Sequence, residues 1–154
     1  MIIYLFLLTI SLLWFLIILS CPLAIHFGFA GDTTFKLIYF VFKFICHQLP
    51  ERSYFIWGIQ MPVCARCFGI YLGMILGLLV YPFLKELNNS KIPQLKTITI
   101  FVAPMLIDAI AQSLRLYTTS NLIRSITGIW FSIGIIFCLM PLLNNIRKNS
   151  NRSK

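Results

Sequence analysis

Charged side chains are scarce in this sequence, and that scarcity excludes a soluble globular protein. Only 11% of the 154 residues are charged, whereas soluble domains average ~25%. Hydrophobic residues make up 59% of the chain, which is more than a soluble core of this length could bury. The composition therefore predicts a polytopic membrane protein, in which lipid replaces water around the apolar side chains.

The sequence also lacks a long basic stripe, although its formal net charge is +9. Its 13 Lys and Arg residues are spread over loop ends and the C-terminal tail. This distribution argues against nucleic-acid binding and suits a lipid bilayer with anionic headgroups. A separate soluble domain, a linker and a low-complexity segment are also missing, so we expect a single integral membrane domain over residues 1–154.

Four apolar stretches are long enough to cross a bilayer as helices, which takes about 20 residues. A further aromatic-rich segment, 35–45, makes only ~16 Å of helix and predicts a short interfacial or re-entrant helix. The sequence thus predicts an all-α fold, a four-helix transmembrane bundle with this short helix before a Cys-His segment at 46–67. The expected spans are 2–20 (ended by Pro22 and the stretch 28–32), 65–84, 97–116 and 122–143.

Basic residues are divided almost evenly between the two expected membrane faces. The turn after the second span and the C-terminal tail together hold slightly more of them than the opposite face. Because basic residues concentrate on the cytoplasmic side, this excess favours both termini in the cytoplasm of a multi-pass protein of the cell membrane. The Cys-His segment would then face outward.

A row of small residues follows one face of the second expected span, at Gly69, Gly73 and Gly77. Such a row lets a neighbouring helix approach closely. We expect it to form a helix contact, and it also makes a homo-oligomer through these three glycines a candidate assembly.

Three cysteines and a histidine lie within the 22 residues of the Cys-His segment. Cys64 and Cys67 should open a helix, whose free N–H groups and positive dipole end favour thiolates. Their spacing lets both sulfurs reach one tetrahedral metal ion, and Cys46 and His47 complete a Cys3His ligand set. Because adjacent residues rarely ligate the same ion, His47 is either the fourth ligand or an acid–base group. The segment therefore predicts a metal site, with zinc as the metal.

Two other interpretations of the cysteines stay open. A Cys64-x-x-Cys67 pair at a helix start is similar to that of quinone-coupled, disulfide-generating membrane enzymes, in which Arg66 would stabilise a thiolate and Cys46 would exchange disulfides. The third interpretation is a non-catalytic scaffold or transporter subunit, and the sequence leaves open whether the protein is an enzyme. Two further cysteines in apolar surroundings are expected to be inert: Cys21 and Cys138.

Polar side chains also fall within the third and fourth expected spans, where ionisable groups are costly and mark a functional site. Asp108 and Gln112 share one helix face, and Asn121 and Arg124 share another. The register of this helical hairpin predicts an ion pair between Asp108 and Arg124, which serves either function or helix register. We expect catalytic roles for His47, Asp108 and Arg124, and binding of an anionic lipid headgroup or small polar solute by Arg52, Arg66, Gln112 and Asn121.

The connectivity of the chain predicts that these two clusters meet at one end of the bundle. The second span starts at the Cys-His segment, the third span returns to that side, and the fourth span leaves from it. This prediction holds whichever way the protein is oriented in the membrane.

Two motifs summarise these clusters. The first is Cys46-His47-Gln48-x-x-x-Arg52-Ser53 followed by Pro62-Val63-Cys64-Ala65-Arg66-Cys67-x-Gly69-Ile70-Tyr71-x-Gly73. The second, looser motif comprises Asp108, Gln112, Asn121, Arg124, Thr127 and Gly128. Together they resemble the uncharacterised membrane protein family named domain of unknown function number 2085. The resemblance implies a small multi-spanning protein and implies no particular activity.

Overall fold

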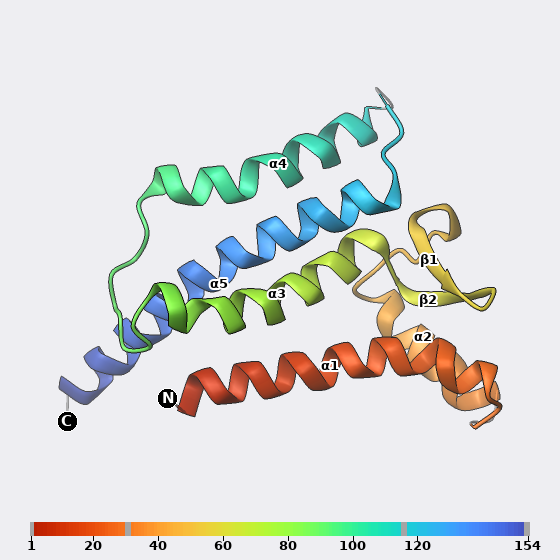
Figure 1. The fold of residues 1–154 in the computed structure, drawn as a ribbon, viewed down its shortest axis with the longest axis horizontal. Coiled ribbons are helices and arrows are strands. Elements are labelled where there is room, and N and C mark those ends of the chain that lie inside the picture. Colours follow the sequence, from red (N-terminus) through yellow and green to blue (C-terminus); the bar gives the residue numbers. More distant parts are fainter. Residues whose placement is uncertain (1, 30–31, 115–116, 153–154) are drawn as a thin grey trace.

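Four long apolar helices dominate the computed structural model, which describes residues 2–29, 32–114 and 117–152. Each is long and apolar enough to cross a membrane. Figure 1 shows them side by side in the order α4, α5, α3 and α1, with both termini at the end away from the strands. This arrangement confirms the predicted all-α membrane fold. The helices are α1 (Ile2–His26), α3 (Ala65–Leu84), α4 (Leu95–Ser113) and α5 (Asn121–Arg152).

The first helix runs further than expected, because it continues through Pro22 to His26. Apolar residues flank the proline on both sides, and proline is tolerated in membrane helices when neighbouring groups satisfy the freed backbone. Pro22 does not end the helix, but the expected stretch 28–32 does, beginning with Gly28, whose positive φ of 65° suits glycine. There the N–H of Phe29 donates to the carbonyl oxygen of Ala24 at 3.0 Å, as in a Schellman motif.

A short helix follows the first span, as expected, and is α2 (Asp32–Lys43). Its length of about 18 Å is too short to cross a bilayer. It packs against α1 and against the second strand.

The third expected span, 97–116, corresponds to α4, which ends at Ser113. Residues 115 and 116 of that expected span lie outside the described residues.

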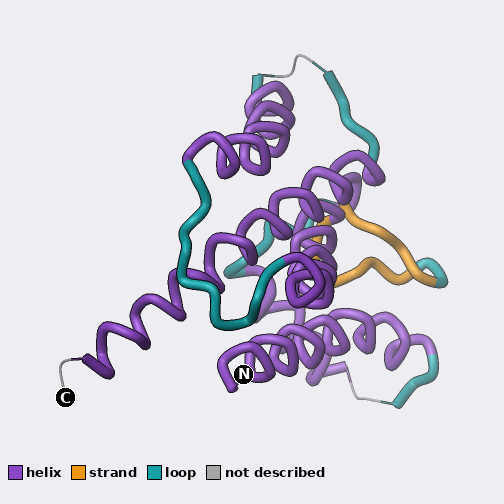
Figure 2. The backbone as a smooth tube through the Cα atoms, turned by 60° about the vertical axis from the view of Figure 1, so that its left-hand side comes forward, coloured by secondary structure: helices purple, strands orange, loops and turns teal. Residues whose placement is uncertain are grey.

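An antiparallel β-hairpin, which was not predicted from the sequence, occupies much of the Cys-His segment. A 3-10 turn (Pro50–Arg52) leads into β1 (Ser53–Ile56), which pairs with β2 (Ile59–Cys64). Both turn residues have positive φ, 50° at Trp57 and 76° at Gly58, as a type I′ turn requires. Figure 2 shows the strands in orange at one end of the bundle, and β2 leads directly into α3.

The predicted glycine row lies against α5 of the same chain. A Cβ atom at Gly69 would stand 2.2 Å from the carbonyl oxygen of Ser125, and one at Gly73 would stand 2.6 Å from that of Ile129. Glycine is therefore required for α3 and α5 to approach this closely. The row therefore forms the expected helix contact within the chain.

Candidate functional site

Three cysteines from separate parts of the chain converge at the start of α3. Cys46 follows α2, Cys64 ends β2 and caps α3, and Cys67 lies in the first turn of that helix. Their Sγ atoms all lie within 4.8 Å of one another. Thiolates ~2.3 Å from one zinc ion stand about 3.8 Å apart, so small side-chain rotations would let all three bind the same ion. The predicted cysteine cluster is therefore present.

Hydrogen bonds at this cluster favour the ionised form of one sulfur, that of Cys64. The backbone N–H of Cys64 donates to Sγ of Cys46 at 3.1 Å. Hydrogen bonds from the thiols of Cys46 and Cys67 hold the pKa of Cys64 well below its usual range, with backbone N–H groups of the first turn of α3 contributing. The pKa of Cys46 is raised, chiefly because its thiol donates to Cys64.

The loop that carries Cys46 is fixed to the hairpin by glutamine side chains. Gln48 has a positive φ of 51°, and its Nε2 donates to the carbonyl oxygens of Tyr39 at 2.9 Å and Pro62 at 2.7 Å. Gln60 returns a bond from its Nε2 to the carbonyl oxygen of Gln48 at 2.7 Å. Gln48 is part of the first motif, but no role for it could be predicted from the sequence. Its hydrogen bonds hold the loop so that Cys46 lies beside Cys64.

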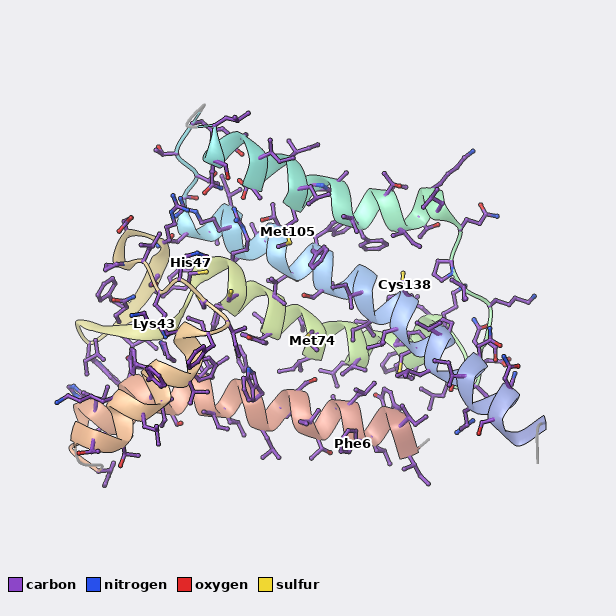
Figure 3. The ribbon with its side chains drawn as sticks, turned by 180° about the vertical axis from the view of Figure 1, so that it is seen from behind. Phe6, Lys43, His47, Met74, Met105 and Cys138 are labelled. Atoms are coloured by element: carbon purple, nitrogen blue, oxygen red, sulfur yellow. The ribbon has the colours of Figure 1, made fainter. Side chains whose placement is uncertain are left out.

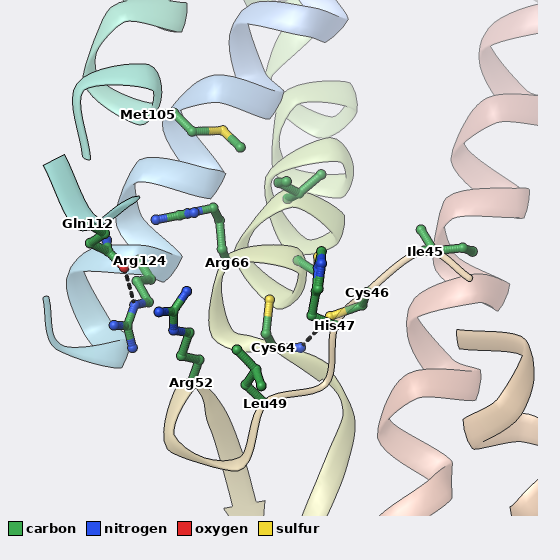
Figure 4. A pocket seen from close by; sticks show the side chains of 12 residues that line it. Ile45, Cys46, His47, Leu49, Arg52, Cys64, Arg66, Met105, Gln112 and Arg124 are labelled. Atoms are coloured by element: carbon green, nitrogen blue, oxygen red, sulfur yellow. Dashed lines mark hydrogen bonds between the residues drawn. The ribbon is translucent and has the colours of Figure 1, made fainter. Parts of the chain in front are cut away.

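His47 lies beside the cysteine cluster rather than within it. Its imidazole is not among the ligand atoms that lie within 4.8 Å of one another. The side chain is exposed and lines the same cavity as the three cysteines. Figure 4 shows it next to Cys46, above the loop that carries both. This position agrees better with a group that faces a ligand than with a fourth metal ligand.

Asp108 of α4 is the centre of a polar network, but the expected ion pair with Arg124 does not form. The carboxylate pairs instead with Arg66, the residue between the two cysteines of α3. The helical register correctly predicted that Asp108 lies near Arg124. It could not predict that the long side chain of Arg66, from α3, would bind the same carboxylate. The remaining donors to this carboxylate are Gln112 at 2.7 Å, Thr119 at 2.8 Å and Tyr117 at 2.9 Å.

Arg124 is buried and is held by neutral groups. Its Nε donates to Gln112 Oε1 at 3.1 Å and its Nη1 donates to Asn121 Oδ1 at 2.8 Å. The amide of Asn121 in turn donates to the carbonyl oxygen of Ser53 at 3.2 Å, which ties α5 to the hairpin. Only 8% of Arg124 is exposed, so a positive charge is buried here with amide partners and no directly bound carboxylate among the described residues.

A cavity of about 290 Å³ joins the two clusters at one end of the bundle, as the connectivity predicted. Cys46, Cys64 and Cys67 line one side, and Arg52, Arg66, Gln112 and Arg124 line the other. An adjoining hollow of about 450 Å³ shares Arg52, Gln112 and Arg124 and extends to Tyr117 and Thr118. Figure 4 shows the guanidinium groups of Arg52 and Arg124 close together at one wall. Every residue assigned to the site from sequence lines this cavity or contacts a residue that does.

Sequence reasoning missed several residues that build this site. Tyr117 and Thr119 complete the network around Asp108, and they lie in a connection that carried no motif. Ser125 bonds both the Tyr54 hydroxyl and the carbonyl oxygen of Ala65, each at 2.9 Å, and so joins the hairpin, α3 and α5. Such contacts between distant segments leave no periodic signal in a single sequence.

The fold and the cavity define a polytopic membrane protein with a cysteine-rich site at one end of its helix bundle. The chain belongs to the family described as "Predicted membrane protein (DUF2085)", which matches residues 46–138. The match spans the Cys-His segment, α3, α4 and most of α5. It confirms the resemblance drawn from the two motifs.

Two uncharacterised relatives are similar to much of the chain. An uncharacterised protein of Methanocaldococcus jannaschii is 42% identical over 130 residues, which cover 80% of this chain and 83% of the relative. An uncharacterised protein of Methanothermobacter thermautotrophicus is 36% identical over 94 residues, which cover 61% of this chain and 83% of that protein. No solved structure matches the chain.

Proposed function

We propose that the protein holds a zinc ion on Cys46, Cys64 and Cys67 at one face of a cell membrane, beside a cavity that binds an anionic headgroup or a small polar solute. One observation carries this proposal. The three sulfurs, gathered within 4.8 Å of one another, line the same cavity as three arginines.

The chemistry of the three sulfurs suits zinc. Zinc accepts thiolates in tetrahedral geometry, and the backbone N–H of Cys64 that donates to Sγ of Cys46 would support a thiolate bound to the metal. Three protein ligands leave a fourth position for water or substrate, which is the pattern of catalytic zinc sites. A bound zinc ion would act there as a Lewis acid. His47 borders the cavity and has the reach and chemistry of an acid–base group.

The opposite wall is suited to an anion. Arg52, Gln112 and Arg124 line the cavity with hydrogen-bond donors, and Arg66, whose guanidinium group pairs with Asp108, lines it as well. Guanidinium groups bind carboxylate and phosphate with paired hydrogen bonds. The ligand would thereby lie with its polar group next to the metal position.

Metal content per mole of purified protein, with thiol titration on the same sample, tests the metal site. Protein prepared without added metal should contain about one zinc per chain, because the three sulfurs would hold a single ion. Cys64→Ser should lose it, whereas Cys138→Ser should retain it. Cys138 is the matched control because it lies along α5, away from His47 and the cluster (Figure 3). Wild-type protein without metal, or equal metal in both variants, would refute the proposal.

Disulfide exchange is the second candidate, and the closeness of the same sulfurs favours it. Cys64 would attack a partner disulfide and form a mixed disulfide, which Cys67 would resolve, so that the partner leaves with two thiols and Cys64 and Cys67 are oxidised. Cys67→Ser should then trap the mixed disulfide on a non-reducing gel. A metal-loaded protein that traps none supports the zinc site instead.

A further inference from the structure

We infer that the cavity holds a phospholipid, with its phosphate group against Arg52 and Arg124 and its acyl chains along Ile70 and Met105. This inference rests on the proposed function and names the ligand class of the same site. It follows from three properties of the cavity: a buried charge without a counter-charge, the net charge of the walls and the position of the apolar lining.

The buried charge is that of Arg124, which is more than nine-tenths buried. Its two hydrogen-bond acceptors are the amide oxygens of Gln112 and Asn121, and its Nη2 has no partner among the described residues. The nearby carboxylate of Asp108 is bound by four other donors. Burying a cation without a bound anion is unfavourable. The site is thus built to receive an anion from outside the chain.

Arg52 supplies the second half of the anion site. Its exposed side chain lines both hollows and forms no hydrogen bond or ion pair within the described part of the chain. Figure 4 shows its guanidinium group beside that of Arg124. Two like charges held together repel each other, and an oxyanion between them would remove the repulsion. Nε of Arg66, another residue that lines the cavity, is also buried without a partner among the described residues.

The net charge of the loaded cavity suits a phosphodiester. Three guanidinium groups line it, and the carboxylate of Asp108 neutralises that of Arg66. A zinc ion with three thiolates carries one net negative charge, counting histidine as neutral. One positive charge remains, which a singly charged phosphodiester balances. Phosphate oxygens can also accept bonds from both arginines at once.

The apolar lining extends from the arginines into the spanning helices. Ile70 lies about 8 Å into α3 from its start, and Met105 lies about 12 Å into α4 from its end. Ile45 and Leu49, both exposed, complete the apolar part of the wall. A free phosphate ion would use none of these side chains. A headgroup with acyl chains would fill both parts of the cavity.

Binding of short-chain lipids to the full-length protein in an uncharged detergent tests this inference by calorimetry. The probes are dioctanoyl phosphatidylglycerol, dioctanoylglycerol without phosphate, and inorganic phosphate. Phosphatidylglycerol should bind, and Arg52→Gln should weaken it about tenfold by removing a charge-assisted hydrogen bond. Arg147→Gln is the matched control, because this arginine bonds Asn88 at the opposite end of the bundle. The affinity of the Arg147→Gln variant for phosphatidylglycerol should stay within about twofold of that of the wild-type protein.

Several results would overturn the inference. Equal affinities of the Arg52 and Arg147 variants would exclude the arginine site. Equal binding of dioctanoylglycerol would exclude recognition of phosphate, and equal binding of inorganic phosphate would exclude a lipid as its source. The metal content of the same samples separates this inference from the proposed function. Protein without zinc that still binds phosphatidylglycerol through Arg52 refutes the metal site and supports the lipid site.

Discussion

Arg66, which stands between Cys64 and Cys67, forms an ion pair with Asp108 of α4. The residue that borders the cysteine cluster therefore also joins α3 to a helix that packs mainly on α5. Only 4% of the Asp108 side chain and 21% of the Arg66 side chain are exposed. The cysteine cluster and the polar network of α4 and α5 are thus parts of one structure.

Asp108→Asn should destabilise the protein strongly. The substitution leaves Arg66 partly buried without its counter-charge, and breaking a buried ion pair from one side costs about 3 kcal/mol or more. The free energy of unfolding in dodecyl sulfate titrations measures the effect. Glu86→Gln is the matched control, since Glu86 is exposed and lies beyond the end of α3. Equal stability of the two variants would show that the ion pair contributes nothing.

Gly69→Ala should disrupt the contact between α3 and α5. The new Cβ would lie 2.2 Å from a backbone oxygen, so the helices must separate, and overpacking of this kind costs about 1–3 kcal/mol. Gly77→Ala should be milder, because its Cβ would meet its nearest neighbours at 3.2 Å. The two variants are compared by heating samples to a series of temperatures and measuring by size-exclusion chromatography how much folded protein remains. A Gly69 variant that stays folded and only changes from oligomer to monomer would place the glycine row between copies.

His47→Ala should keep its zinc, because the imidazole lies outside the group of three sulfurs. Its metal content should match wild type, in contrast to that of Cys64→Ser. The rate at which zinc is lost during dialysis against a weak chelator compares the two proteins more sensitively than their metal content does. Rapid loss of metal from the His47 variant alone would make this residue the fourth ligand, as the Cys3His interpretation of the sequence allowed.

Both termini should be cytoplasmic, since they lie at the same end of the bundle and the basic residues there are slightly in excess (Figure 1). A fluorescent protein fused to the C-terminus should fluoresce, and alkaline phosphatase at the same position should be inactive. An active phosphatase fusion would invert the orientation and place the cysteines on the cytoplasmic side.

The spanning helices and the convergence of the two clusters could be predicted from sequence, because both follow from apolar length and from the order of spans. The hairpin could not, since its turn is Trp57-Gly58 and tryptophan is unusual at a left-handed position. The partner of Asp108 was also predicted wrongly. The helical register of the hairpin predicts only which residues of α4 and α5 lie level with each other. Arg66 comes from the start of α3, and only the tertiary packing of the helices brings it to Asp108. Pro22 suggested a helix end that the apolar residues around it override.

X-ray absorption at the zinc edge of protein purified without added metal tests the central claim most directly. We predict three sulfur neighbours at ~2.3 Å and one nitrogen or oxygen neighbour at ~2.0 Å, with the sulfur signal reduced or absent in Cys64→Ser. Such a spectrum would establish the cysteine cluster as an open zinc site. Absence of zinc, or zinc surrounded only by nitrogen and oxygen, would contradict the account.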